Sequence, residues 1–363
     1  MKIKDLCSYA PKSRIKAGEA VENAKYLFFT SSEDENKRYT DFQFDKEAII
    51  MGTGGNATLH YYNGKFSVST DCLVLFPNSK IKCKYLYYFF KSHMSVLEAG
   101  FKGAGLKHTN KKYIEEINVS KIPDLTTQEK IVSHLDTITE NIEKLNRELE
   151  LFDSLTKARF VEMFGDYLKD DRRPLSEVAI ITGGLTKNSN RNTFETKMPY
   201  LRVANVFYNR LDLREILKIG VKEEEIEKTL LQAGDLLFVE GNGSIEQIGR
   251  VAIWNGSIDP ILHQNHLIKA RFNNEIIAPE YALFYFMLQD GRQQIISKSV
   301  STSGLNTLSV NKVSSLLLPI PPIALQNQFA NFVRQVDKSR EAVKKSLEKT
   351  QQLYDSLMQE YFG

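Results

Sequence analysis

The sequence is poor in cysteine and contains no long apolar run. Its three cysteines are an odd number without CxxC spacing, which excludes a disulfide framework and a cysteine-based zinc site and fits a reducing, cytoplasmic compartment. The densest apolar run, residues 85–90, is far shorter than the ~20 residues that a membrane span needs, so we expect no association with a membrane. The first residues carry an acid and no apolar core, so they predict no signal peptide.

The sequence also lacks an excess of charge of one sign. Its 48 Lys and Arg residues against 45 Asp and Glu residues give a formal charge of +3, which excludes a uniformly basic protein but not a nucleic-acid binder with local patches. Along the chain, residues 1–121 carry +6, 122–169 carry −4, 170–321 are neutral and 322–363 carry +1. The acidic second segment is therefore expected to face protein partners more than phosphates.

Motifs for catalysis are missing as well. The glycine-rich segments 52–56 and 241–244 lack the lysine of a phosphate-binding loop and the full GxGxxG pattern. His263 and His266 have no Asp, Glu or Cys companion that would complete a metal site, so solvated or core histidines are the simpler interpretation. No Asn/Asp-Pro-Pro-Tyr/Phe segment of an amino-methyltransferase is present. We therefore expect no catalytic residue, no metal and no cofactor, and a protein that is not an enzyme.

An internal repeat is the strongest feature that is present. Ile122-Pro123…Gln128 recurs as Ile320-Pro321…Gln326, an offset of 198 residues. Two further matches follow in the same order: Asp153-Ser154-Leu155 with Asp355-Ser356-Leu357, and Phe164-Gly165 with Phe362-Gly363. The distance from the Gln to the Asp is 25 residues in the first copy and 29 in the second. This difference is about one helical turn, which would keep the apolar faces nearly in phase.

The repeat predicts a globular half, a long helix, a second globular half and a second long helix, with boundaries at 1–121, 122–169, 170–321 and 322–363. Both helices carry a seven-residue apolar period, typical of a coiled-coil seam. The seam positions are Ile131, Leu135, Ile138, Ile142, Leu145, Leu149 and Phe152 in the first helix, and Phe329, Val333, Val336, Val343, Leu347, Tyr354, Leu357 and Tyr361 in the second, which Arg340 and Thr350 interrupt. Antiparallel pairing is the shorter connection, and it would place the two halves at opposite ends of a rod with an approximate two-fold axis. The alternative is two ordinary amphipathic helices packed on separate domains.

Each globular half reads as a mixed α/β (α+β) domain. Segments 48–51, 66–68, 72–76 and 235–239 predict strands, and segments 85–97 and 280–296 predict helices. Polar loop residues are candidates for DNA contact, because Arg and Lys suit guanine and phosphate while Asn and Gln suit adenine. The candidates are Lys12, Arg14, Lys16, Asn56, Lys102, Lys107, Lys111, Lys187, Asn188, Arg191, Arg202, Asn205, Arg250, Ser301 and Ser303. For any single one of them, a solvated surface position is the competing interpretation.

Taken together, these segments resemble the specificity (S) subunit of a type I restriction-modification system. The resemblance covers nearly the whole chain. It rests on the Ile-Pro…Gln helix heads, the Asp-Ser-Leu and Phe-Gly tails, Pro199 to Val206, Gly234 to Phe238, Ile248 to Ala252, Gly52 to Ala57 and Asn63 to Phe66. Asp124 to Thr127 departs from the proline-rich run that is usual in the family, which bears only on how sharply the first helix begins.

The resemblance implies two target recognition domains separated by two conserved helices that form an antiparallel coiled coil. Each domain would read one half of a split double-stranded DNA sequence, while the helices act as a spacer and dock methyltransferase (M) subunits. Those partners would bind S-adenosylmethionine and methylate adenine, and restriction (R) motor subunits would use ATP. The sequence thus predicts a DNA-recognition subunit without its own cofactor. The alternative from another class is a coiled-coil assembly scaffold without DNA readout.

Overall fold

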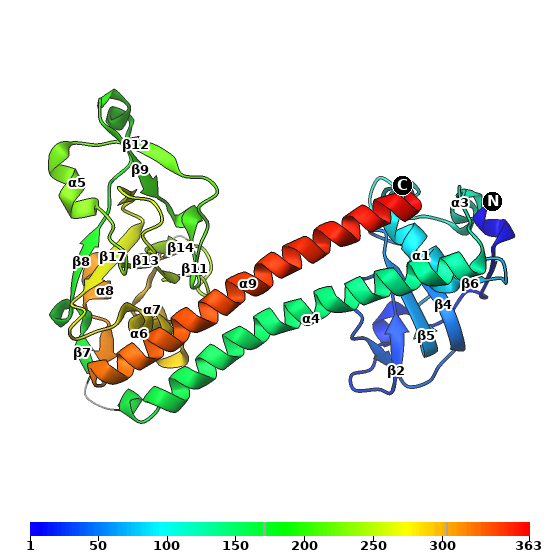
Figure 1. Cartoon of the computed structure of the whole chain (residues 1–363), viewed down its shortest axis with the longest axis horizontal. Helices are drawn as coiled ribbons and strands as arrows, with labels where there is room; N and C mark the ends of the chain where they lie inside the picture. The colour runs from blue at the N-terminus through cyan, green and yellow to red at the C-terminus, as the bar shows by residue number, and fades with distance from the viewer. Residues whose placement is uncertain (170–171, 303) are drawn as a thin grey trace. The chain divides into compact units, whose positions relative to one another are not determined.

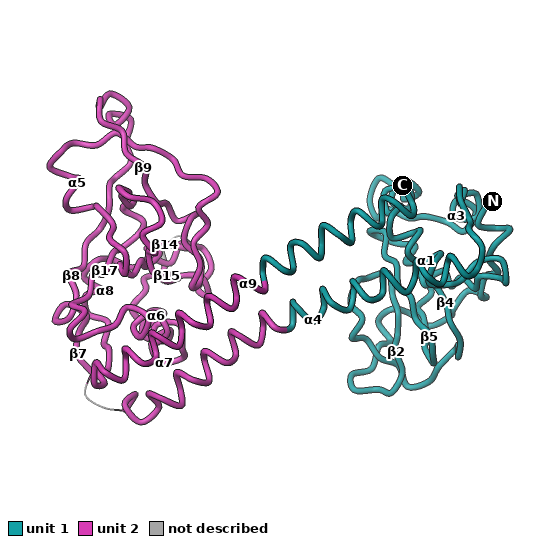
Figure 2. Tube along the Cα trace, in the orientation of Figure 1, with its two compact units in different colours: residues 1–147, 344–363 teal, residues 148–343 magenta. Residues whose placement is uncertain are grey.

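Two helices of 40 residues each organise the structure, α4 (Leu125–Phe164) and α9 (Ile323–Phe362) (Figure 1). The structure is a computed structural model that describes residues 1–169, 172–302 and 304–363. The chain divides into unit 1, residues 1–147 and 344–363, and unit 2, residues 148–343 (Figure 2). Each unit therefore contains one globular part together with portions of both long helices. The boundaries at 121/122, 169/170 and 321/322 stay a prediction.

Unit 1 is built on one six-stranded sheet of order β1-β6-β4-β5-β2-β3. Its strands are β1 (Cys7–Tyr9), β2 (Tyr26–Phe29), β3 (Arg38–Tyr39), β4 (Phe44–Gly52), β5 (Leu59–Val68) and β6 (Cys72–Pro77). Its short helices are α1 (Cys83–Ser92), α2 (Met94–Ala99) and α3 (Lys111–Glu116), with the 3-10 turns η1 (Ile3–Asp5) and η2 (Ala17–Glu19). The aromatic side of α1 is buried with Leu135 of α4 and Met358 of α9 in one core cluster.

Unit 2 is larger and its strands fall into several small sheets, of which β15-β13-β17-β8 is central. Its strands are β7 (Arg172–Pro174), β8 (Ala179–Gly183), β9 (Lys197–Leu201), β10 (Val206–Phe207), β11 (Arg210–Leu211), β12 (Leu217–Gly220), β13 (Leu236–Val239), β14 (Gly241–Asn242), β15 (Val251–Ile253), β16 (Leu262–His263), β17 (Leu267–Phe272), β18 (Val300–Thr302), β19 (Leu305–Thr307) and β20 (Leu317–Pro319). Its helices are α5 (Glu223–Thr229), α6 (Pro279–Met287), α7 (Gln289–Lys298) and α8 (Val310–Ser314), with 3-10 turns η3 (Tyr167–Lys169), η4 (Leu175–Glu177), η5 (Ser189–Thr193) and η6 (Val203–Asn205).

The two units share a core topology. The antiparallel neighbours β1-β6-β4-β5 of unit 1 correspond in chain order and pairing to β8-β17-β13-β15 of unit 2. In both units a short helix follows the sheet, α1 in unit 1 and α6 in unit 2, and a second helix begins after one intervening residue. The predicted helical segments 85–97 and 280–296 are thus each two helices, because His93 and Leu288 leave the helical conformation.

The helices confirm the antiparallel pairing within each unit. In unit 1 the end of α9 packs on the start of α4, where Tyr361 lies 3.2 Å from His134 Nδ1. In unit 2 the end of α4 packs on the start of α9, where the rings of Phe160 and Phe329 lie 5.3 Å apart. The predicted mixed fold with two long antiparallel helices is therefore confirmed.

Both helices have the same length, which corrects one sequence expectation. Their first and last residues are separated by the same offset of 198, so the four-residue difference around the Asp-Ser-Leu segments is not an inserted turn. Asp153 corresponds to Gln351 in the structure and not to Asp355. At this constant offset the two seams coincide position by position.

The seam positions are the less exposed positions of each helix. Ile131, Leu135 and Ile138 are buried, and so are their equivalents Phe329, Val333 and Val336. The remaining seam positions are half-buried: Ile142, Leu145, Leu149 and Phe152 in α4, and Arg340, Val343, Leu347, Thr350, Tyr354, Leu357 and Tyr361 in α9. Towards each end the buried positions recur every four residues, at Thr156, Phe160 and Phe164 in α4 and at Met358 and Phe362 in α9.

A buried glutamine explains the Ile-Pro…Gln signature. Gln128 is fully buried, its Oε1 accepts from the backbone N–H of Lys82 at 2.8 Å, and its Nε2 donates to the Pro123 carbonyl at 2.8 Å. Gln326 makes the same two contacts, with Ala278 N–H at 2.9 Å and the Pro321 carbonyl at 2.8 Å. Lys82 and Ala278 are the N-cap residues of α1 and α6. The amide therefore ties the start of each long helix to the short helix of its unit.

Candidate nucleic-acid interface

In unit 1 two loops lie together where the central strand β4 ends, residues 53–56 directly after β4 and residues 102–108. Gly55 N–H donates to the Lys107 carbonyl at 2.9 Å, and Thr109 N–H donates to the Thr53 carbonyl at 3.0 Å. A side chain at Gly54 would meet the His108 ring at 3.2 Å, so glycine permits this close approach. We call residues 53–56 and 102–108 the first loop pair.

The first loop pair collects several of the predicted DNA-contact residues. Asn56, Lys102 and Lys107 lie on it and are exposed. The segment bearing Arg14 and Lys16 is fastened nearby, because the Ile15 carbonyl accepts from Thr70 N–H at 2.8 Å and the neighbouring Asp71 carbonyl accepts from Thr53 N–H at 2.8 Å. The structure therefore brings the backbone segments that carry these five residues close together.

The other two predicted residues of unit 1 are placed differently. Lys12 is exposed at the start of the same segment. Lys111 opens α3, where its ammonium lies 4.5 Å from the centre of the Tyr9 ring and 3.5 Å from Glu115 Oε1. Its charge thus interacts with unit 1 itself.

Unit 2 repeats the loop pair at the equivalent place. Residues 241–244 follow β13, and β14 pairs with β19 through Gly241 with Thr307 and Asn242 with Asn306, while β18 pairs antiparallel with β19. Leu308 N–H donates to the Glu240 carbonyl at 2.7 Å, the counterpart of the Thr109 bond in unit 1. We call residues 241–244 together with strands β18 and β19 the second loop pair. Ser301 lies on it and is exposed, and Ser303 lies outside the described residues.

Two residues predicted to contact DNA, Arg191 and Asn205, are instead buried and bonded to groups of the chain itself, so that prediction is wrong for both. The Arg191 guanidinium is buried, and it donates to both Glu225 carboxylate oxygens at 3.0 and 2.8 Å and to the carbonyls of Gly220 and Thr186. The same pair holds the pKa of Glu225 below its usual range. Asn205 is buried, and its amide binds three backbone groups, the N–H of Arg202 and the carbonyls of Asp212 and Glu215. Neither side chain has a free polar edge to present to DNA.

The remaining predictions in unit 2 fall into two groups. Lys187 and Asn188 are exposed in the loop that precedes η5. Arg202 and Arg250 are half-buried: Arg202 pairs with Glu215 at 2.8 Å, and Arg250 donates to the Val203 carbonyl at 3.2 Å. None of these four residues lies on the second loop pair, whereas Asn56, Lys102 and Lys107 lie on the first loop pair of unit 1.

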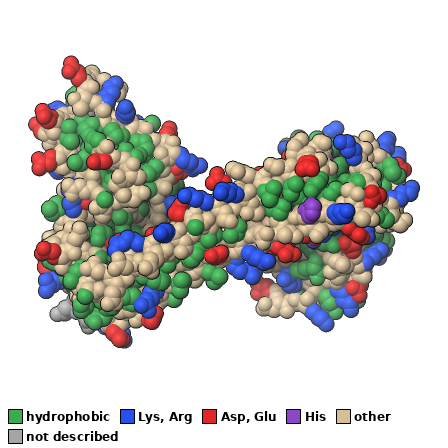
Figure 3. Space-filling model, in the orientation of Figure 1, with side chains coloured by type: hydrophobic (Ala, Val, Ile, Leu, Met, Phe, Trp, Pro, Cys, Tyr) green, Lys and Arg blue, Asp and Glu red, His purple; other side chains and the backbone are tan. Residues whose placement is uncertain are grey.

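Two further arginines, Arg210 and Arg292, were not among the residues that the sequence predicted to contact DNA. Arg210 is exposed on β11, and Arg292 of α7 donates to three carbonyls of the segment that follows the second loop pair. The available signal was the run Phe207-Tyr208-Asn209-Arg210, in which Asn marks a tight turn next to aromatic and basic residues. On the face seen in Figure 3, side chains of both charge signs are interspersed.

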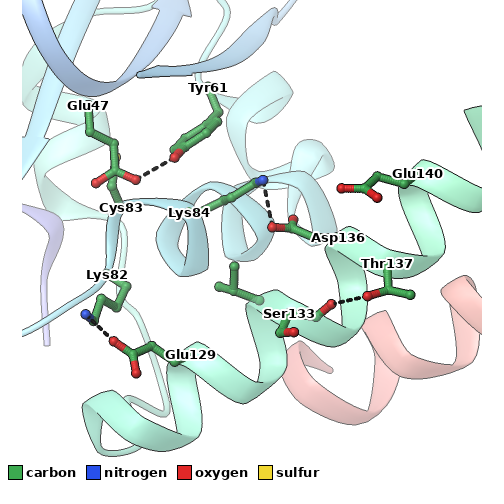
Figure 4. A pocket seen from close by; sticks show the side chains of 11 residues that line it. Glu47, Tyr61, Lys82, Cys83, Lys84, Glu129, Ser133, Asp136, Thr137 and Glu140 are labelled. Carbon is green, nitrogen blue, oxygen red and sulfur yellow. Dashed lines mark hydrogen bonds and ion pairs between the residues drawn. The ribbon is translucent and has the colours of Figure 1, made fainter. Parts of the chain in front are cut away.

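An open hollow of about 490 Å³ lies in unit 1 between α1, the sheet and α4. Its charged groups satisfy one another: Lys84 pairs with Asp136 at 2.8 Å, Lys82 with Glu129 at 2.5 Å, and Tyr61 O–H donates to Glu47 at 2.5 Å (Figure 4). Burial raises the pKa of the Cys83 thiol, which keeps it protonated and a poor nucleophile. This arrangement supports packing and offers no poised catalytic group.

Within the described residues, no group of three or more His, Cys, Asp and Glu side chains is placed to hold a metal ion. The close pair of histidines is split: His263 is buried and its Nδ1 bonds the Thr229 carbonyl at 2.8 Å, while His266 is exposed beside Glu240 at 2.7 Å. No helix of the described part of the chain has the length and apolar character to cross a bilayer.

Comparison with known proteins places this geometry in context. The family model of the type I restriction modification DNA specificity domain matches residues 1–151 and 171–352. The chain is 24% identical to the type I restriction enzyme EcoKI specificity subunit of Escherichia coli (strain K12), over 98% of this chain and 77% of that protein. It is 29% identical to the putative type I restriction enzyme MjaX specificity subunit of Methanocaldococcus jannaschii over 50% of this chain, and it spans 43% of that relative's length.

Solved structures share the fold. The type-I restriction-modification system S subunit from M. genitalium superimposes with a TM-score of 0.69 at 17% identity, covering 100% of this chain and 95% of that chain. A chain from a study of complex assembly and conformational transition of the type I R-M system matches with a TM-score of 0.51 at 14% identity. Both cover the whole chain, so the fold similarity includes the long helices as well as the globular parts.

Proposed function

Because the chain belongs to the family of type I restriction-modification DNA specificity domains, we propose that it reads a bipartite DNA target, one half with each loop pair. It is a specificity subunit for DNA sequence recognition and not an enzyme. In this proposal α4 and α9 set the distance between the half-sites. They also dock the methyltransferase subunits, through which restriction subunits join the complex.

The recurrence of the loop pair carries the proposal. In each unit the two loops are joined by an equivalent backbone hydrogen bond directly after the corresponding strand, from Thr109 N–H to the Thr53 carbonyl after β4 and from Leu308 N–H to the Glu240 carbonyl after β13. A buried scaffold that holds polar loops at the ends of its strands suits sequence readout, because base contacts need side chains held in a fixed position. Having two such sets of loops in one chain fits a target with two halves.

Exposed leucines on the long helices support partner docking. Leu155 of α4 is 50% exposed and Leu353 of α9 is 51% exposed, and the offset of 198 makes them equivalent positions. Exposed apolar side chains on a soluble helix mark surfaces for other proteins when they recur in a pattern. The same kind of partner subunit could therefore dock on each unit. S-adenosylmethionine and ATP would be bound by the partner subunits and not by this chain.

The proposal is tested by the sequence that the complex modifies. The chain is co-expressed with its methyltransferase partner, and methylated adenines are mapped across a genome. The expected result is a motif of two short half-sites separated by a fixed gap. A continuous motif, or no methylation beyond that of cells lacking the chain, would contradict bipartite reading.

The spacer role has its own test. Inserting four residues between Leu135 and Leu149, about one helical turn, is expected to change the gap and leave both half-sites unchanged. Changed half-site bases would contradict a role of the helices as the spacer.

A pure assembly scaffold would show no salt-dependent binding of duplex DNA by the assembled complex, whereas phosphate contacts make binding fall as salt rises.

A further inference from the structure

Unit 2 carries a small hairpin that has no equivalent among the strands of unit 1. Strands β10 and β11 pair antiparallel, with Phe207 opposite Arg210, and Tyr208-Asn209 form the turn between them. Asn209 has a φ of 46°, in the left-handed region that asparagine tolerates better than most residues. The hairpin is fastened to the central sheet, because Asn209 N–H donates to the Val251 carbonyl at 2.9 Å.

Three arginines surround the two aromatic rings of this hairpin. The guanidinium carbons of Arg210 and Arg250 lie 4.5 and 5.2 Å from the centre of the Phe207 ring. The guanidinium carbon of Arg292 lies 5.5 Å from the centre of the Tyr208 ring. Contacts of this kind hold a guanidinium plane in one orientation while its N–H groups stay available at the edge.

These arginines lack a carboxylate partner in the described part of the chain. No ion pair within 4.0 Å joins any of the three to an acid. Asp212, two residues after Arg210, is paired with Arg214 at 2.5 Å, and Arg210 acts on it only over a longer range. The cluster therefore gathers three positive charges at one place in a unit that carries 23 basic and 24 acidic residues in total.

Two of the three arginines, Arg250 and Arg292, donate hydrogen bonds to backbone carbonyls of unit 2, Arg250 to that of Val203 at 3.2 Å. Arg292 donates to the carbonyls of Ile245 and Glu246 at 2.9 Å each, and also to that of Ile248. Tyr208 O–H donates to the Glu246 carbonyl at 2.6 Å. The segment that follows the second loop pair is thereby locked to the hairpin. Arg210, by contrast, is exposed and no hydrogen bond occupies its side chain in the described structure.

We propose that the β10–β11 hairpin is a DNA-contacting element of unit 2, in which Arg210 donates to an acceptor oxygen of duplex DNA. Arg250 and Arg292 are positioning residues that hold the hairpin and its positive charge in place. The acceptor is a phosphate oxygen or the O6 edge of guanine, the two DNA groups that a guanidinium binds best. This inference rests on the proposed function, and it adds to that function a contact present in one unit only.

The test uses the complex of the full chain with its methyltransferase partner and a duplex that contains the methylated motif. Binding is measured against salt concentration for wild type, Arg210→Gln, Arg210→Lys and the matched control Arg214→Gln, an exposed arginine of the same segment. Tryptophan fluorescence checks folding, because Trp254, the sole tryptophan, is buried in unit 2. For Arg210→Gln we expect a loss of roughly 5- to 100-fold in affinity, and for Arg214→Gln a change within about twofold.

The variants separate the two acceptors. A phosphate contact predicts that Arg210→Gln lowers the slope of log affinity against log salt by about 1 for every sequence, and that Arg210→Lys retains it. A guanine contact predicts that both variants relax the motif at one base pair of one half-site, because lysine lacks the bidentate fork.

If Arg210→Gln binds as Arg214→Gln does, with an unchanged motif, the hairpin proposal is overturned while the proposed function stands. If the wild-type complex itself shows no sequence-specific binding, both are overturned.

Discussion

Units 1 and 2 pack the start of a long helix against a short helix in the same geometry, but with reversed charges. In unit 1 Lys84 of α1 pairs with Asp136 of α4 at 2.8 Å. In unit 2 Glu280 of α6 pairs with Arg334 of α9 at 2.6 Å, and Arg334 stands 198 residues after Asp136. The contact is therefore retained while the sign of each partner is exchanged.

The buried contacts beside this ion pair show no such freedom. Gln128 and Gln326 make the same contacts with equivalent backbone groups. Tyr85 and Tyr281 both donate to the carbonyl two residues before the proline of the Ile-Pro…Gln signature, at 3.4 and 3.1 Å. Inside a core an amide needs both its donor and its acceptor satisfied, so no other residue type serves. At a half-exposed surface either order of charges gives the same small Coulomb gain. The comparison shows which parts of the repeat are fixed by burial.

The largest expected effect concerns the phenylalanine that ends each long helix. Phe164 is fully buried, and its ring lies 4.7 Å from Tyr281 and 5.5 Å from Phe329. Phe164→Ala should destabilise unit 2 by about 3–5 kcal/mol, because it leaves a cavity among aromatic rings. The equivalent Phe362 is 5% exposed and its ring lies 5.1 Å from that of Tyr85 and 6.4 Å from that of Phe89, so its packing is looser and Phe362→Ala should cost less. Denaturant unfolding followed by Trp254 fluorescence reports unit 2, and amide exchange in α1 reports unit 1. Equal losses of stability for Phe164→Ala in unit 2 and Phe362→Ala in unit 1 would contradict this expected difference between the units.

A pH effect should appear in unit 2 through His263. Burial lowers the pKa of His263 to about 4 from the usual 6.5. Because the folded pKa lies below the unfolded one, the stability of unit 2 is full above about pH 6.5 and is lost as the pH falls towards 4. The free energy of unfolding reported by Trp254 should drop by on the order of 2–3 kcal/mol between pH 7 and 4.5. His263→Gln should flatten this dependence. A wild-type curve as flat as that of the variant would show that His263 does not titrate in this way.

The glutamine contacts should show a moderate and paired effect. Gln326→Leu would leave the buried Ala278 N–H and the Pro321 carbonyl without partners, at a cost of about 1–3 kcal/mol. Gln128→Leu should cost a similar amount in unit 1, where the Lys82 N–H loses its acceptor. Amide exchange at the first turns of α1 and α6 measures each site. Unchanged protection at both turns would show that the amides do not anchor the short helices.

The smallest effect should come from the reversed ion pairs. Lys84→Glu places two carboxylates together and should destabilise unit 1 by about 0.5–1 kcal/mol, because both side chains are partly exposed. Adding Asp136→Lys restores opposite charges in the order found in unit 2 and should recover much of this loss. The recovery stays incomplete, because Asp136 also accepts from Tyr88 O–H at 2.6 Å. A double-mutant cycle measures the coupling. A coupling near zero would reduce the ion pair to a surface contact without energetic weight.

The repeat and the periodicity of the helices were readable from the sequence. A seven-residue apolar period lies in the order of residues itself, and buried positions of both helices followed it. The strands in segments 48–51, 66–68, 72–76 and 235–239 were predicted because dense apolar runs bounded by turn residues signal buried strands. The candidate loops were also located, since glycine clusters mark loops regardless of their surroundings.

Which polar side chains are free was decided only by the tertiary structure. Arg191 and Asn205 stand in polar loops just as Lys107 and Asn56 do, yet Glu225 and the chain's own backbone occupy the first two. Arg210 and Arg292 lie 82 residues apart in the sequence and meet at one hairpin through the fold. The structure likewise showed that α4 and α9 have equal length, so the four-residue shift of the Asp-Ser-Leu segments in the sequence is not an insertion. Periodicity is a local property that a sequence records directly, whereas the partner of a side chain depends on long-range packing, which folding alone brings together.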